Sequence, residues 1–272
     1  MISSISNLLG YLLNFIYNLV NNYGLAIILF SILIKIILIP LSIKQQKTLK
    51  IQTKMQGEVK ALQFKYKNDP EKLNKEMMDL YKRENMSPLS GCLSSIIQII
   101  LLFSVFYMVR SPLTYMKKVD ASKIEEYKSS ISTSTGYPEV QIIKEKGQED
   151  NSVYLNMNFL GLDLSSVPSK DYGDYKVFII PALYVISSFI SMKISLNTQN
   201  NKQKDENKEN SEKDEIDTMQ DMNKSMSYMM PIMAVSISLV APLGLALYWL
   251  VNNVLMIGER IVLNKVLEKE EE

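Results

Sequence analysis

Apolar residues gather in five blocks along the chain, and most charged residues lie between these blocks. The blocks cover residues 24–43, 92–109, 177–192, 226–241 and 243–257. At a rise of about 1.5 Å per residue, the first block is about 30 Å long, which matches the hydrocarbon core of a bilayer. The pattern predicts a polytopic membrane protein, even though the mean hydropathy of the whole chain is close to zero.

Lys35 interrupts the first apolar block near its middle. An ammonium group at that depth costs from about 3 to more than about 10 kcal/mol, so such charges usually face a helix bundle or a wet cavity. The alternative is that Lys35 only extends its charge to the membrane surface. Lys44 marks the nearest boundary, about 13 Å along the helix, which is more than one side chain comfortably reaches. We therefore expect Lys35 to line a polar site within the membrane.

Residues 1–22 carry no charged side chain and lack the features of a cleaved secretory signal. Apolar positions recur at helical spacing, and polar positions fall on the other face of the helix. The apolar set is Ile2, Ile5, Leu9, Leu12, Ile16 and Leu19, and the polar set is Ser3, Ser6, Asn7, Asn14, Asn18 and Asn21. The pattern predicts an uncleaved amphipathic helix in the membrane interface. An additional span is less favoured, because its asparagines would lie in lipid.

Residues 44–87 are highly charged, with eleven Lys or Arg and six Asp or Glu. Asn68, Asp69 and Pro70 separate two helical patterns and are typical of a turn followed by a helix start. We expect a helical hairpin whose apolar stripes face each other. Its positive charge predicts a cytoplasmic location. Its basic residues are equally consistent with binding a specific partner and with contacting anionic lipid headgroups.

Several motifs then indicate a family. They are IPLSIKQQK (39–47), KYKNDPEKLNKEMMDLYK (65–82), PLSGCL (88–93), NFLGLDLS (158–165), MMPIM (229–233) and PLGLALYWLVNN (242–253). In this order, over nearly the whole chain, they resemble the YidC/Oxa/Alb family of membrane protein insertases. The resemblance implies an all-α polytopic membrane protein with five transmembrane helices around a hydrophilic groove, a cytoplasmic helical hairpin and an N-terminal interfacial helix.

Hydropathy and the resemblance together divide the chain into ten segments. They are an interfacial helix (1–22), a first span (23–44), a cytoplasmic hairpin (45–88), a second span (89–110), an extracytoplasmic loop (111–175), a third span (176–196), a disordered cytoplasmic loop (197–225), a fourth span (226–241), a fifth span (242–264) and an acidic cytoplasmic tail (265–272). Placing residues 44–87, 193–226 and 258–272 inside gives twenty Lys or Arg on that side, and residues 110–175 on the outer side hold eight. This bias predicts an outer N-terminus and a cytoplasmic C-terminus. The resemblance implies that the membrane is a bacterial plasma membrane.

The resemblance also implies two sets of site residues. The residues expected to contact substrate in the groove are Lys35, Gln98, Ser187, Ser191, Tyr248 and Trp249. The residues expected to act in the cytoplasmic hairpin are Tyr66, Asp69, Pro70, Lys72 and Tyr81. Family members commonly have arginine at the position of Lys35. Unlike arginine, a buried lysine can lose its proton, but water in the groove is expected to keep Lys35 charged.

The function implied by the resemblance is insertion and folding of nascent membrane proteins, without catalysis, cofactor or metal. The chain has no histidine and one cysteine, Cys92, which argues against the usual zinc sites and an internal disulfide framework. Expected partners are nascent membrane proteins and the lipid bilayer, with the secretion translocon and the ribosome as further candidates and no recognition of nucleic acid as such. The acidic ending EKEEE argues against tethering to the ribosome through the tail. The alternatives are a secondary transporter or channel subunit with Lys35 as its substrate or ion site, and a structural assembly factor.

Overall fold

A computed structural model describes residues 2–84, 90–131, 136–203, 233 and 235–269 of the 272 residues. The α-helices and strands, in chain order, are α1 (Ile2–Val20), α2 (Tyr23–Lys65), α3 (Pro70–Arg83), α4 (Ser90–Arg110), α5 (Ala121–Ser130), α6 (Pro138–Lys146), β1 (Asn158–Phe159), β2 (Leu162–Asp163), α7 (Ile179–Gln203) and α9 (Leu243–Lys269). A π-helical turn at Leu113–Lys117 follows α4, and a 3-10 turn at Tyr175–Phe178 precedes α7.

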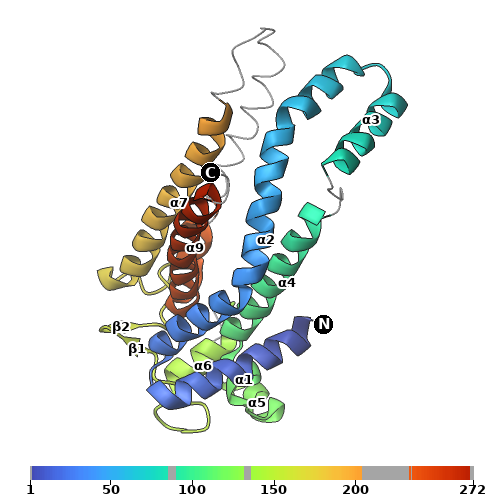
Figure 1. Ribbon diagram of the computed structural model, residues 1–272. Helices are drawn as coiled ribbons and strands as arrows, with labels where there is room; N and C mark the ends of the chain where they lie inside the picture. Colours follow the sequence, from blue (N-terminus) through green and yellow to red (C-terminus); the bar gives the residue numbers. More distant parts are fainter. Residues whose placement is uncertain (1, 85–89, 132–135, 204–232, 234, 270–272) are drawn as a thin grey trace.

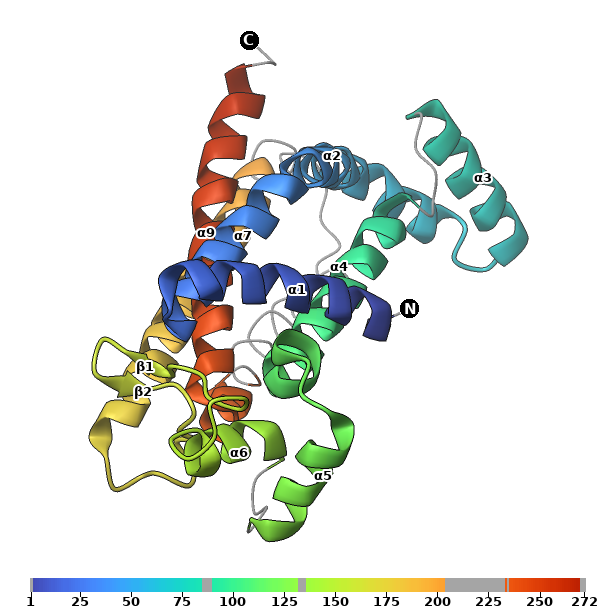
Figure 2. The same cartoon turned by 90° about the horizontal axis from the view of Figure 1, so that it is seen from below.

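Four long helices form the body of the molecule. Helices α2, α7 and α9 pack on one another, while α4 contacts α1, α2 and α9 (Figure 1). Helix α1 lies across the end of this bundle, and the short helices α5 and α6 and the two strands gather at the same end (Figure 2). The fold is therefore predominantly helical, and we call residues 111–175 the loop layer.

Three described helices are long and apolar enough to cross a membrane. These segments are Tyr23–Gln52, Tyr175–Ile194 and Leu243–Leu263, and they correspond to the predicted first, third and fifth spans. The described apolar part of α4, Ile96–Arg110, is shorter than these three. Most of the predicted fourth span, 226–241, lies outside the described residues. Two of the five spans therefore stay predictions.

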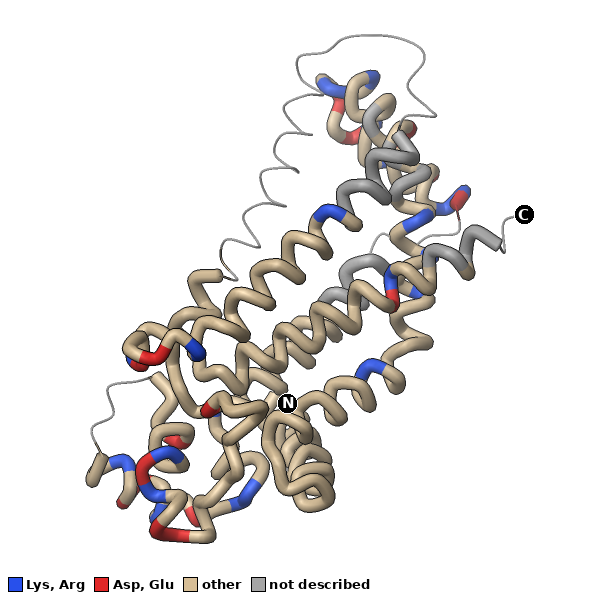
Figure 3. The backbone as a smooth tube through the Cα atoms, turned by 90° about the vertical axis from the view of Figure 1, so that its left-hand side faces the viewer, with Lys and Arg blue, Asp and Glu red and all other residues tan. Residues whose placement is uncertain are grey.

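The charged residues gather at the two ends of the molecule, and a largely uncharged band separates them (Figure 3). One end is the loop layer, and the other holds the end of α2 together with α3. This distribution suits a protein whose middle lies in hydrocarbon.

Helix α2 continues without interruption from the predicted first span into the predicted hairpin, with Pro40 inside the helix. The hairpin is completed by α3, whose start was predicted correctly. The Asp69 carboxylate accepts a hydrogen bond from the backbone N–H of Lys72 at 3.1 Å, and Pro70 occupies the first turn. Met55 on α2 and Leu80 on α3 are buried.

Helix α7 extends farther than the sequence suggests. It continues to Gln203, so the first seven residues of the predicted disordered loop are helical. The apolar part of the helix ends near Ile194, and the remaining turns add no candidate span. The rest of that predicted loop, from residue 204, lies outside the described residues.

Helix α1 has two apolar faces, whereas the sequence predicted one apolar and one polar face. Leu9, Leu13 and Ile16 are buried against the protein. A separate stripe is exposed and consists of Leu8, Tyr11, Phe15 and Leu19. The sequence placed Ser6 on the polar face with the asparagines. In the structure Ser6 is fully buried where α1 packs on α4, and its hydroxyl donates to the carbonyl oxygen of Ser104 at 2.9 Å.

The loop layer is held to α1 and within itself by polar contacts. The hydroxyl of the buried Tyr17 on α1 accepts a hydrogen bond from the backbone N–H of Asn156 at 2.9 Å. The Lys123 ammonium lies 2.5 Å from the Asp150 carboxylate and holds the pKa of that carboxyl well below its usual range. The described part of the loop layer therefore caps one end of the bundle.

Candidate functional site around Lys35

Lys35 lies about 18 Å along α2 from the first residue of the helix, Tyr23. The helix start is fixed by Asn22, whose side chain accepts a hydrogen bond from the backbone N–H of Leu25 at 3.0 Å. The side chain of Lys35 is 24% exposed. The next residues, Ile36 and Ile37, are 57% and 60% exposed. At this level of α2, the isoleucines therefore point outward while Lys35 points toward the other helices.

Lys35 is paired with an acidic residue that sequence reasoning missed. Its Nζ atom lies 2.5 Å from Oε2 of Glu259 on α9, and the Glu259 side chain is 15% exposed. Both residues belong to candidate spans, so a cation and an anion meet between two apolar helices. Within the described part of the chain, the other carboxylate oxygen, Oε1, is buried without a hydrogen-bond partner.

Arg260 adds a second positive charge beside this pair. It directly follows Glu259 on α9 and is partly buried. The three side chains Lys35, Glu259 and Arg260 together carry a formal charge of +1. A signal in the sequence could have found this site, because the apolar run of α9 is interrupted by Glu-Arg and resumes with Ile261 and Val262.

The predicted serines lie where α7 meets α9. The Asn253 side-chain amide donates to the hydroxyl oxygens of both Ser187 and Ser188, at 3.0 Å each. Ser187 and Asn253 are both buried, and so is Ser191. These polar contacts hold α7 against α9, about 9 Å along α9 from Glu259.

The two predicted aromatic residues differ in environment. Tyr248 is 7% exposed and belongs to the apolar core. Trp249 is half-buried, and its ring centroid lies 6.1 Å from that of Tyr184 on α7. Tyr248 precedes Glu259 by eleven residues, or about 16 Å of helix, so these aromatic groups lie at a different depth from Lys35.

Gln98 lies at yet another level. Its side-chain amide donates to the side-chain oxygen of Gln45 at 2.7 Å, which joins α4 to α2. Gln45 follows Lys35 by ten residues, or about 15 Å. The residues predicted to contact substrate are therefore spread along the bundle, and only Lys35 meets an opposite charge there.

Four of the five predicted hairpin residues lie around the turn between α2 and α3, and Tyr81 lies near the other end of α3. Tyr66 caps the end of α2. Its ring lies beneath the ammonium groups of Lys65 and Lys72, whose Nζ atoms are 5.1 and 5.3 Å from the ring centroid. Asp69 and Pro70 start α3. Tyr81, on the second half of α3, is half-buried. The turn thus presents positive charge held against an aromatic face.

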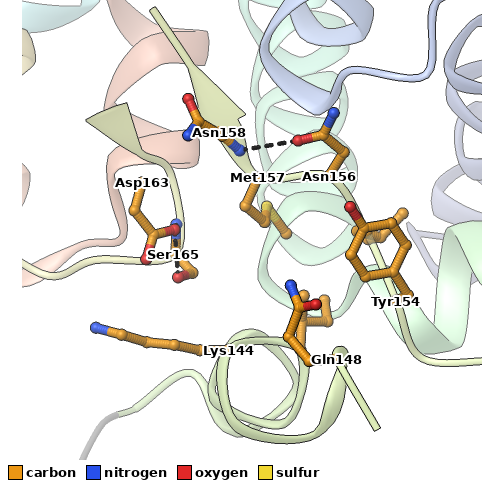
Figure 4. Close-up of a pocket in the computed structure, with 10 residues that line it drawn as sticks. Lys144, Gln148, Tyr154, Asn156, Met157, Asn158, Asp163 and Ser165 are labelled. Atoms are coloured by element: carbon orange, nitrogen blue, oxygen red, sulfur yellow. Dashed lines mark hydrogen bonds between the residues drawn. The ribbon is translucent and has the colours of Figure 1, made fainter. Parts of the chain in front are cut away.

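A separate pocket of about 340 Å³ lies in the loop layer (Figure 4). Its labelled polar side chains include Lys144, Gln148 and Asp163. None of its lining residues belongs to α2 or α9. Lys144 is already paired with Asp171, at 3.0 Å, and Asp163 accepts hydrogen bonds from Ser165. The charged groups of the pocket are therefore engaged within the protein.

Comparison with known proteins identifies the family. The family model described as "60Kd inner membrane protein" matches residues 15–270, which is nearly the whole chain. The chain belongs to the 60Kd inner membrane protein family. The family assignment agrees with the resemblance found in the motifs.

Several curated relatives carry the name "Membrane protein insertase YidC". One from Chloroherpeton thalassium is 31% identical over 94% of this chain, and one from Treponema denticola is 27% identical over 98% of it. The chain spans only 35% and 38% of the length of these two relatives. A relative from Fusobacterium nucleatum is matched over nearly its whole length. It is 29% identical, and the match covers 94% of this chain and 93% of the relative.

Proposed function

We propose that this chain is a membrane protein insertase that moves the polar end of a nascent membrane protein partway into the bilayer. Its family and the names of its relatives support this proposal. The observation that carries it is the position of Lys35, a mostly buried cation between α2 and α9 in the membrane-spanning part of the fold. The transporter or channel alternative gains no support from the names of these relatives.

The proposed architecture has five spans around a hydrophilic groove that opens to the cytoplasm and to lipid. The interfacial helix and loop layer lie on the outer side, and the hairpin of α2 and α3 lies in the cytoplasm. This orientation places the N-terminus outside and the C-terminus inside a bacterial plasma membrane. It follows the positive-inside rule and the separation of charge between the two ends of the molecule.

The proposed mechanism is electrostatic and requires no covalent chemistry. A polar tail that enters hydrocarbon loses hydration, and water beside Lys35 reduces that loss. An acidic group of the tail is attracted to Lys35. At an effective dielectric constant near 20, a contact at 4 Å contributes about 4 kcal/mol before desolvation is subtracted. The apolar helix of the client then moves sideways into lipid, driven by its own burial.

Reconstitution tests this proposal directly. Liposomes that contain only the purified chain are given a single-span client with an acidic amino-terminal tail, and its insertion is measured by protease protection. The chain is expected to insert the client, Lys35→Ala to reduce insertion to the level of empty liposomes, and Lys35→Arg to retain it. Lys193→Ala, at the end of the apolar part of α7, is the matched control and is expected to retain insertion. Full insertion by Lys35→Ala would refute the role of the charge.

The hairpin is proposed to receive clients before they enter the membrane. Its turn gathers Tyr66, Asp69, Pro70 and Lys72. Deleting residues 48–84 is expected to reduce insertion while the remaining helices stay in the membrane. Full activity of a stably integrated deletion variant would contradict this role.

A further inference from the structure

We propose that Glu259 is a specificity-determining residue that competes with client carboxylates for Lys35. This inference rests on the proposed insertase function and extends it to the choice of client. In the structure, Glu259 occupies the position that a client carboxylate would take, 2.5 Å from the Lys35 ammonium. Lys35 is therefore already neutralised before any client arrives.

The pair is accessible to a competitor. Lys35 and Glu259 keep 24% and 15% of their side-chain surface exposed. The flanking residues Ile37 and Val262 are 60% and 58% exposed, so the outer faces of both helices are apolar at this level. The charges lie between the two helices, and a polar tail that enters there meets both charges together.

The hydrogen bonding of Glu259 favours exchange over a permanent link. Its Oε1 atom is buried and has no hydrogen-bond partner among the described residues. A buried ion pair contributes little to stability unless its remaining lone pairs are satisfied. A client carboxylate that replaces Glu259 keeps the charge contact at Lys35, so the exchange does not leave the lysine unpaired.

Arg260 offers a neighbouring positive charge to the displaced carboxylate. It directly follows Glu259 on α9, where it is partly buried. When a client carboxylate holds Lys35, Glu259 still has a cation beside it, which reduces the cost of an isolated buried anion. Two cations and one fixed anion thus leave room for one further negative charge.

The consequence is a minimum number of acidic residues that a client tail needs in order to bind Lys35. A tail with no carboxylate does not displace Glu259, and a tail with one carboxylate competes against an anion that is already in place. A tail with several carboxylates has more ways to occupy Lys35 and wins more often. The chain is therefore selective for acidic tails, and Glu259 sets how acidic the tail must be.

Peptide binding tests this inference separately from insertion. The purified full chain in nanodiscs is titrated with a fluorescent tail peptide that carries one aspartate, and with the same peptide carrying asparagine instead. Glu259→Gln is expected to bind the aspartate peptide about fivefold more tightly than the unaltered chain, because a partly exposed ion pair is worth up to about 1 kcal/mol. The asparagine peptide is expected to bind both proteins equally.

A matched control removes the same charge elsewhere. Glu149→Gln breaks an ion pair with Lys146 in the loop layer, where the two groups are 2.9 Å apart. It is expected to leave both affinities unchanged. Equal affinity of the unaltered chain and Glu259→Gln for the aspartate peptide would overturn the inference. Weaker binding by Glu259→Gln, together with a lower thermal midpoint, would also overturn it and would assign Glu259 a structural role.

Insertion assays then separate this inference from the proposed function. With clients whose tails carry zero to three aspartates, Glu259→Gln is expected to insert the one-aspartate client severalfold faster than the unaltered chain. Failure of every protein to insert any client would refute the proposed function, and the peptide affinities would still decide the role of Glu259. Identical dependence on tail acidity in both proteins would contradict the competition.

Discussion

Replacing Asn253 by alanine tests how α7 is held against α9. The Asn253 amide donates to Ser187 and Ser188 at 3.0 Å each, and Asn253 is 8% exposed. Hydrogen bonds between membrane helices average about 0.6 kcal/mol, so two bonds amount to about 1.2 kcal/mol. Ser187 still donates to the carbonyl oxygen of Tyr184 at 2.8 Å, so its hydroxyl keeps one partner and the loss stays near this average.

The assay is thermal unfolding of the detergent-solubilised chain. At about 2–4 °C per kcal/mol, Asn253→Ala is expected to lower the midpoint by about 2–5 °C. Asn252→Ala is the matched control, because Asn252 donates to Tyr248 of its own helix, at 2.9 Å. Its effect is expected to be smaller. Equal midpoints for the two variants would refute the assignment of Asn253 as the polar link between α7 and α9.

Three further predictions concern α1 and the loop layer. Gly10→Ala places a methyl group against the backbone of the π-helical turn and is expected to lower the free energy of unfolding by about 1–3 kcal/mol in a denaturant titration. The control Gly136→Ala places its methyl group in open space and is expected to change this free energy by less than about 0.5 kcal/mol. Tyr17→Phe removes the acceptor of the Asn156 backbone N–H and is expected to destabilise the chain by about 1 kcal/mol. The control Tyr11→Phe changes an exposed side chain and is expected to leave stability unchanged. The lowered pKa of the Asp150 carboxyl contributes folding stability at pH values above the usual aspartate pKa near 3.8, and this contribution is lost as the pH falls below 3.8. Asp150→Asn is expected to remove this acid dependence from thermal midpoints measured between about pH 6 and pH 2. Equal midpoints for either matched pair, or an unchanged acid dependence in Asp150→Asn, would contradict these contacts.

The sequence predicted the long helices well, because apolar blocks of membrane-spanning length are a strong signal. It also located the start of α3, because Asp69 and Pro70 supply a cap and a fixed first turn. It did not predict that α2 would continue from the membrane into the hairpin. The change from apolar to charged residues at Lys44 suggested a boundary, but it does not prevent the helix from continuing.

The sequence did not predict contacts between residues that are far apart in the chain. Lys35 was recognised from its depth, but Glu259 is far from it in sequence. The charges of Glu259 and Arg260 interrupt the apolar run of α9, but charges near the end of an apolar block are also typical of a membrane boundary. Ser6 was assigned to a polar face because it shares that face with asparagines. Only the crossing of α1 over α4 shows that its hydroxyl has a buried acceptor, the carbonyl of Ser104.

Thiol labelling of residue 35 tests the central claim most directly, namely that a water-accessible cation lies between the helices. In a Cys92→Ser background, Lys35→Cys and Ile37→Cys are expressed in membranes and treated with a charged, membrane-impermeant thiol reagent. Ile37, 60% exposed on the outer face of α2, is the lipid-facing control. The account predicts that the cysteine at position 35 is labelled from the cytoplasmic side while that at position 37 is not. Equal resistance of both positions to labelling would contradict it.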